Sequence, residues 1–317
     1  GWCCISVPAM ELRRFCSQSR VVIVAGKGGV GKTTVTAALA LAATRAGMTV
    51  LIAEVEGKAG LAAAFGTEPL GYADTELAAG VRARTIPPDA ALVDYLESHG
   101  LKRIGNRLAS SGALEVVATA VPGMKDILVL GKIKSLEQEP AADLIIVDAP
   151  AAGHAVSFLL SAQGLLDAIR VGPIRKQATD VVELLSDPER CQVMLVTLPE
   201  ETPVNEVVDT AFAIEDRAGV ALGPIIVNGC VPPLDCGVPS ADELVAAGVD
   251  PALADGAHDA AAFRAQRNEL QREQISRLDA RLPLPRIELP LVFTAEVGPA
   301  ELTVLADALV AGIEALP

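Results

Sequence analysis

The sequence predicts an α/β fold built on a doubly wound, mostly parallel sheet. Short, continuous apolar runs bounded by turn residues recur along the chain, as expected for strands buried on both faces. Longer stretches that favour helices lie between them, and this alternation is what a doubly wound sheet requires. Aromatic residues are 3% of the 317, and the apolar residues are mainly alanine, valine and leucine, which suits helices packed closely on a buried sheet.

The predicted elements follow one another in regular order. Strands are expected at residues 21–25, 49–54, 144–148, 193–197 and 225–228, with a late one at 285–289. Helices are expected at residues 32–46, 153–170 and 203–218. The interval 59–139 carries one clear strand signal, at residues 81–86, and otherwise favours helices with breaks at glycine and proline.

We therefore predict one main domain over residues 20–317, preceded by an N-terminal extension at 1–19. A helical insertion is expected at about residues 66–140. A second segment, at about 230–282, is rich in Ala, Asp, Arg and Gln and predicts surface helices.

Charge and hydropathy exclude several classes of function. The net charge of −14 repels nucleic acid and anionic membrane surfaces at long range. The short basic cluster at residues 170–176 lacks interleaved aromatics and is typical of a solvated face. No apolar run reaches the roughly 18 residues of a membrane span. We expect a soluble protein with no nucleic-acid partner and no stable membrane insertion.

The six cysteines are too sparse and irregular for a disulfide framework, which favours a reducing cytoplasm. Cys230 and Cys236 are the one downstream pair, and their spacing differs from the CxxC typical of zinc. We expect them to be free thiols.

A phosphate-binding loop follows the first predicted strand and opens the first predicted helix. It fits the pattern G-x-x-x-x-G-K-[ST], and its members are Gly26, Lys27, Gly28, Gly29, Val30, Gly31, Lys32, Thr33 and Thr34. Glycines let backbone N–H groups surround phosphate oxygens, and the helix N-terminus favours the same anion. Lys32 is expected at the β- and γ-phosphates, Thr33 at Mg²⁺ and Thr34 near the α-phosphate.

Asp148 ends the apolar run at residues 144–147. This is the place of the acid that faces Mg²⁺ through a water in nucleoside triphosphatases with such a loop. The alternative is a helix N-cap, because the next helix is expected to begin at residue 153.

Lys27 distinguishes this loop from an ordinary one, because a second lysine sits beside the first glycine. Residues 25–34 resemble the deviant phosphate loop of the signature-lysine ATPases, P-loop NTPases that include arsenite-efflux and tail-anchored-protein-targeting ATPases. In that class the lysine crosses a dimer interface to the partner's nucleotide, as an arginine finger does. The resemblance implies ATP, Mg²⁺ and a catalytic role for Lys27; the alternative is a solvated lysine.

Two further segments narrow the resemblance. Residues 148–154, Asp-Ala-Pro-Ala-Ala-Gly-His, resemble switch II of the arsenite and tail-anchored branch, and residues 121–126 resemble its Pro-Gly-hydrophobe segment. The alanine-rich chain is most similar to the members that actinobacteria carry in pairs. This implies a homodimer, or a heterodimer with a related ATPase, and a client or effector that the sequence does not identify.

The chain also departs from the family pattern. Glu56 stands where switch I of the family has the aspartate that orients the attacking water, and it is one methylene longer. It could polarise water from a shifted backbone, or instead pair with Lys58 on the surface. Asn228 matches the position that reads the adenine edge, or it caps a strand end. His154 could sense the γ-phosphate or serve as a structural hydrogen bonder.

The family's zinc clasp and arsenite-binding cysteines have no counterpart in the sequence. From the phosphate loop and the family resemblance, the leading interpretation is a cytoplasmic Mg-dependent ATPase. Its hydrolysis at a dimer interface is expected to drive movements of the switches and the helical insertion. The alternative is an ATP-binding regulatory or scaffold subunit with weak hydrolysis or none.

Overall fold

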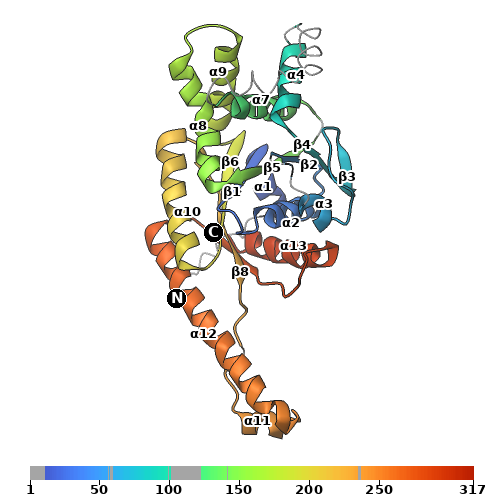
Figure 1. Ribbon diagram of the computed structural model, residues 1–317, viewed down its shortest axis with the longest axis vertical. Coiled ribbons are helices and arrows are strands. Elements are labelled where there is room, and N and C mark those ends of the chain that lie inside the picture. The colour runs from blue at the N-terminus through green and yellow to red at the C-terminus, as the bar shows by residue number, and fades with distance from the viewer. Residues whose placement is uncertain are drawn as a thin grey trace, which may run out of the picture.

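The computed structural model describes residues 11–55, 57, 60–98, 100, 123–140, 142–234 and 237–317. In this part of the chain the centre is a nine-stranded sheet in the order β3-β4-β2-β5-β1-β6-β8-β9, with β7 paired to β6 (Figure 1). The pairing of β3 with β4 is antiparallel, and the other pairings among the described strands are parallel. The strands are β1 (Val21–Gly26), β2 (Val50–Glu54), β3 (Thr75–Ala78), β4 (Val81–Thr85), β5 (Leu144–Ala151), β6 (Cys191–Thr197), β7 (Ala221–Leu222), β8 (Ile225–Cys230) and β9 (Arg286–Pro290).

Helices cover both faces of the sheet, which confirms the predicted α/β fold. They are α1 (Leu12–Cys16), α2 (Lys32–Arg45), α3 (Gly60–Ala64), α4 (Pro88–Ser98), α7 (Met124–Gln138), α8 (Ala152–Ala168), α9 (Pro173–Ser186), α10 (Glu201–Ala213), α11 (Ala241–Ala246), α12 (Pro251–Arg281) and α13 (Pro299–Glu314). A π-helical turn, Ile214–Ala218, continues α10.

Alternation along the strands divides the buried side chains into two cores. In β1, Val22 and Val24 join a core with α1, α2, α3 and α13. Val21, Ile23 and Ala25 point to the other face and join a core with α7, α8, α9 and α10. Successive side chains of a strand point to opposite faces, so continuous apolar runs are what a sheet covered on both sides needs.

The described part of the N-terminal stretch packs on the body. Helix α1 places Phe15 and Cys16, each 3% exposed, in the α2–α13 core. Arg13 donates to the carbonyl of Ala46 at the end of α2. Residues 11–19 therefore contribute to the hydrophobic core.

A helical layer of α4, α7 and α9 lies toward one end of the molecule (Figure 1), and α8 runs from it along the sheet, where it contacts β1 and β5. Strand β4 matches the strand expected at residues 81–86, whereas β3 was not expected, and the two extend the sheet through the β2–β4 pairing. The basic cluster at residues 170–176 leads into α9. The buried side of this helix consists of Ala178, Val181, Leu184 and Leu185.

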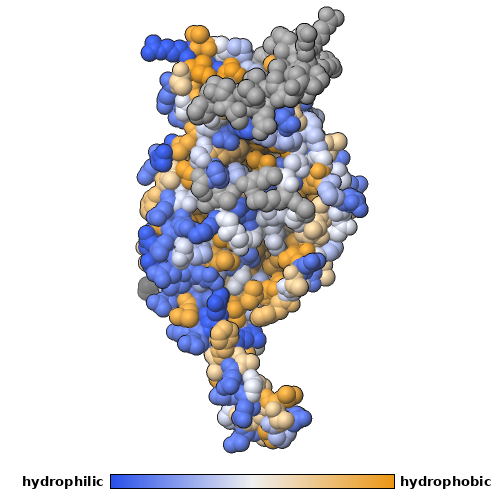
Figure 2. Space-filling view, viewed as in Figure 1, coloured by the Kyte–Doolittle hydropathy of each residue, from blue (hydrophilic) through white to orange (hydrophobic). Residues whose placement is uncertain are grey.

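The segment after β8 forms an arm that projects from the body (Figure 1). Helix α12 has 31 residues, and Ile275 and Leu278 near its C-terminal end join the core. Phe263 and Leu270, further out, are 68% and 53% exposed. Figure 2 shows hydrophobic residues next to hydrophilic ones at the tip of this arm. None of the helices described has the combination of length and apolarity needed to cross a membrane.

Candidate nucleotide-binding site

The phosphate loop leaves the carboxyl end of β1, in the middle of the sheet, and enters α2. Strand β1 pairs with β5 on one side and β6 on the other. Gly29 and Gly31 adopt left-handed backbone angles, with φ of +88° and +90°. L-residues with a Cβ rarely adopt this region, so the loop needs glycine at both positions. The carboxyl edge of a parallel sheet is where ligands of such folds bind.

Two neighbouring strands limit the space around the loop. A Cβ on Gly26 would lie 2.4 Å from the carbonyl oxygen of Val196 in β6, and a Cβ on Gly31 would lie 2.3 Å from Nδ2 of Asn228 in β8. Asn228 Nδ2 donates to the carbonyl of Val30 at 2.9 Å. The structure thus places Asn228 against the phosphate loop, where its amide supports the loop backbone.

Thr33 and Asp148 come together at the start of α2. The Thr33 hydroxyl donates to Oδ2 of Asp148 at 2.7 Å, and Asp148 is 7% exposed. A loop threonine beside a buried aspartate at a strand end is the donor set that holds Mg²⁺ in P-loop NTPases, so these oxygens fit the ion. Within the described residues, no cluster of three or more His, Cys, Asp or Glu side chains could hold a metal by itself.

The two loop lysines point in different directions. Lys32 is 9% exposed, and its Nζ donates to the carbonyl of Lys27 at 3.2 Å, across the loop. Lys27 Nζ instead donates to Oε1 of Glu206 on α10 at 2.6 Å, with side chains that are 43% and 40% exposed. Lys32 therefore lies inside the loop, whereas Lys27 lies on the surface beside α10.

Glu54 lies next to Asp148 and is not among the site residues predicted from the sequence. It ends β2, is 3% exposed, and pairs in register with Asp148 of β5. The Thr85 hydroxyl donates to Oε2 of Glu54 at 3.0 Å. The signal was present, because Val-Leu-Ile-Ala-Glu ends an apolar run with an acid just as the run before Asp148 does.

Parts of the predicted switches lie outside the described residues. Glu56 and Lys58 are among them, as are Val121 and Pro122 of the Pro-Gly segment. The rest of that segment lies near switch II. Burial raises the pKa of Asp126, and the nearby charge of His154 opposes that rise.

The described thiols are free. Cys16, Cys191 and Cys230 form no disulfide, whereas Cys236 lies outside the described residues. Burial raises the pKa of Cys230 to about 12, which disfavours the thiolate that metals bind.

A cavity of about 490 Å³ lies between α4, α7 and α9, away from the phosphate loop. Ion pairs cross its walls, with Lys132 Nζ 2.6 Å from Asp94 and Lys134 Nζ 2.9 Å from Asp180. The walls thus combine charged side chains with apolar ones such as Ala91, Leu128 and Pro173.

Comparison with known proteins gives consistent matches. The family described as anion-transporting ATPase matches residues 19–171. The ATPase BagA of Mycobacterium tuberculosis is 37% identical over 302 residues, covering 86% of this chain and 87% of that protein. The arsenical pump-driving ATPase of Escherichia coli is 29% identical over 66% of this chain and 34% of its own length. The ATPase get3 of Schizosaccharomyces japonicus is 30% identical over 44% of this chain and 42% of its own length.

Proposed function

The chain belongs to the anion-transporting ATPase family and is an ATP hydrolase, and from this premise we propose that it is magnesium-dependent and hydrolyses ATP at a dimer interface. The observation that carries the magnesium dependence is the 2.7 Å contact between the Thr33 hydroxyl and Asp148 at the end of the phosphate loop. It brings together the hydroxyl and the acid that nucleotide-bound Mg²⁺ requires.

The chemistry is in-line attack of water on the γ-phosphate. Lys32, at the start of α2, binds the β- and γ-phosphate oxygens together with the loop N–H groups. Thr33 and Asp148 would hold Mg²⁺, which when bound would supply neutralising charge to the phosphates. Glu56 orients the attacking water, and Asn228 keeps the loop in shape through Val30.

Lys27 is the basis for proposing a dimer. Its exposed Nζ lies on the surface beside the loop and pairs with Glu206 of the same chain. An ion pair this exposed contributes roughly 0–1 kcal/mol of stability. Breaking it therefore costs little when Lys27 moves to a partner's nucleotide. The partner is a second copy or a related ATPase, and the dimer acts on a client or effector in the cytoplasm.

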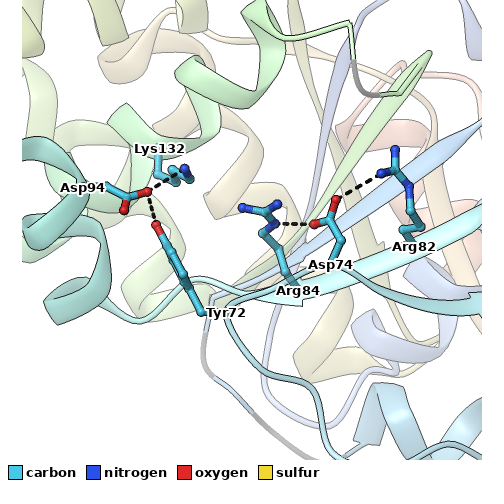
Figure 3. Close-up of polar contacts among 6 residues, drawn as sticks. All are labelled: Tyr72, Asp74, Arg82, Arg84, Asp94 and Lys132. Atoms are coloured by element: carbon cyan, nitrogen blue, oxygen red, sulfur yellow. Dashed lines mark hydrogen bonds and ion pairs between the residues drawn. The ribbon is translucent and has the colours of Figure 1, made fainter. Parts of the chain in front are cut away.

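Movement of the helical layer is proposed to follow the nucleotide state through the edge of the sheet. Figure 3 shows Tyr72 reaching Asp94 of α4, which also binds Lys132 of α7. Arg84 of β4 binds Asp74 at 2.5 Å, and Asp74 follows Tyr72 by two residues in the chain. The next residue of β4, Thr85, contacts Glu54 at the site. These contacts, together with the short stretches of chain that join them, lead from the site to the helices.

A second candidate function is an ATP-binding regulatory or scaffold subunit that hydrolyses weakly beside a more active relative. The observation that favours it is Glu56 in the position of the family's aspartate. A misplacement of about 1 Å at such a residue can cost about 100-fold in rate.

Steady-state ATP hydrolysis of the full chain, alone and with a co-purifying relative, separates these candidates. We expect magnesium-dependent turnover that Glu56→Gln abolishes while nucleotide binding persists. Lys32→Ala, which removes the phosphate-binding cation, is the control that loses binding. Tight binding without turnover in either setting would refute the enzyme and support the regulatory subunit.

A further inference from the structure

We propose that Glu54 is a second acid of the magnesium site, a positioning residue that accepts hydrogen bonds from the ion's water shell beside Asp148. The proposal rests on the proposed function and adds a residue to it. Glu54 is 3% exposed at the end of β2. A carboxylate that is withdrawn from solvent this far is costly unless cations or donors compensate it.

Register and alternation place the two acids together. Strands β2 and β5 are parallel neighbours, and Glu54 pairs directly with Asp148. Val50 and Ile52 of β2, like Leu144 and Ile146 of β5, belong to the core on the α2 side. Residues two apart share a face, so Glu54 and Asp148 leave the sheet on that side, where the Thr33 hydroxyl at the start of α2 contacts Asp148.

The backbone also ties the two strand ends together. The N–H of Val55 donates to the carbonyl of Asp148 at 3.4 Å, and the N–H of Ile86 donates to the carbonyl of Glu54 at 2.9 Å. Adjacent strands are roughly 4.8 Å apart, so the two carboxylates start from positions within reach of one hydrated ion. Their two negative charges match a divalent cation.

A purely structural role makes a different prediction. One side-chain partner of Glu54 is the Thr85 hydroxyl, which donates at 3.0 Å. An amide oxygen would accept that hydrogen bond equally well, so a carboxylate kept for this contact would tolerate Glu54→Gln. A residue that acts through the ion's water shell needs the charge and does not tolerate it.

The test measures magnesium dependence of binding rather than turnover. A fluorescent ATP analogue is bound to the full chain, first without metal and then with increasing Mg²⁺, and Mn²⁺ binding is followed by electron paramagnetic resonance. We expect Glu54→Gln to raise the metal concentration for half-saturation by about 10-fold or more, the range seen when groups supporting a metal site are removed. Metal-free nucleotide affinity should stay within about 2-fold.

Thr85→Val is the matched control, because it removes the hydroxyl and keeps both the β-branch and the Glu54 carboxylate. Its shift should stay below about 3-fold. Glu54→Asp retains the charge and should recover part of the metal affinity lost in Glu54→Gln. Such a recovery would show that the effect of Glu54→Gln comes from the lost charge and not from misfolding. Equal metal dependence in wild type and Glu54→Gln, or an equal shift in Thr85→Val, would overturn the proposal. A wild type without any metal-linked nucleotide binding would instead refute the proposed function.

Discussion

At the scale of single residues, the ion pair between Lys27 and Glu206 gives the first prediction. Glu206→Gln should change the free energy of unfolding by less than about 1 kcal/mol, because both side chains are about two-fifths exposed. Hydrolysis should persist, because Lys27 is released and not removed.

Lys27→Ala should keep ATP binding and lose hydrolysis or nucleotide-linked dimerisation. Turnover assays and light scattering with and without ATP check this, and a fully active Lys27→Ala protein would contradict it.

Gly31 gives a second prediction at this scale. Gly31→Ala should weaken nucleotide binding and lower the free energy of unfolding by about 1–3 kcal/mol, because the backbone is left-handed and the new Cβ would meet Asn228. Gly29→Ala is the matched control, since Gly29 has nearly the same φ but open space within 4 Å of its Cβ. Similar losses in both variants would mean that backbone strain, and not the contact with Asn228, sets the effect.

The sequence predicted single site residues where a local pattern carried the signal. Thr33 and Asp148 followed from a loop and from an acid at a strand end, and the structure brings them into contact. Glu54 carries the same strand-end signal but escaped selection, because acids close many strands and the pairing with Asp148 is not visible locally. The Lys27–Glu206 pair joins positions 179 apart in the chain, which no local pattern encodes.

At the scale of elements, the contacts among Tyr72, Asp94 and Lys132 give a pH prediction. Burial alone would raise the pKa of Asp94, but hydrogen bonds from Lys132 and Tyr72 together lower it below its usual value. A lowered native pKa contributes stability that is present above the unfolded pKa of roughly 3.9 and is lost as pH falls through the native pKa.

Asp94→Asn should therefore lower the free energy of unfolding at pH 7 by about 1–2 kcal/mol, since Lys132 loses its charged partner. The difference from wild type should shrink as the pH falls below the usual aspartate pKa of roughly 3.9 and the native carboxyl takes up its proton. Urea unfolding at both pH values measures it. Tyr72→Phe removes a single donor and should cost less, and a gap that stays constant with pH would exclude the ionic origin.

Strands buried on both faces, and the edge strand β9, were predictable to within a few residues, whereas β3 and α9 were not. Strand β1 was expected at 21–25 and spans Val21–Gly26. Strand β3 escaped because it lies at the sheet edge, where just one of its four residues is buried. Helix α9 escaped because its basic first turn suggested a solvated surface, although its later turns bury Val181 and Leu184. Tertiary packing decides such segments more than local pattern does.

At the scale of the whole molecule, the reactivity of the buried thiols measures how often the hydrophobic cores open to solvent. Burial raises the pKa of Cys16 to about 11 and that of Cys191 to about 12, and the two lie in the cores on opposite faces of the sheet. Few thiolates exist at pH 8, so alkylation in the native state should be far slower than in urea. Mass spectrometry of labelled peptides measures both rates. Rapid native labelling of Cys191 would show that the core opens locally.

The length of α12 has a hydrodynamic consequence. A helix of 31 residues spans about 46 Å, and its outer part projects from the body (Figure 1), whereas a compact chain of this size would have a radius of gyration of about 20 Å. Small-angle scattering should therefore give a larger radius of gyration and a long tail in the pair-distance distribution. The chain should also sediment more slowly than a sphere of equal mass. The arm, a minor share of the mass, thus raises the frictional coefficient of the whole molecule. Rotational diffusion about the two short axes should be slower than about the long one.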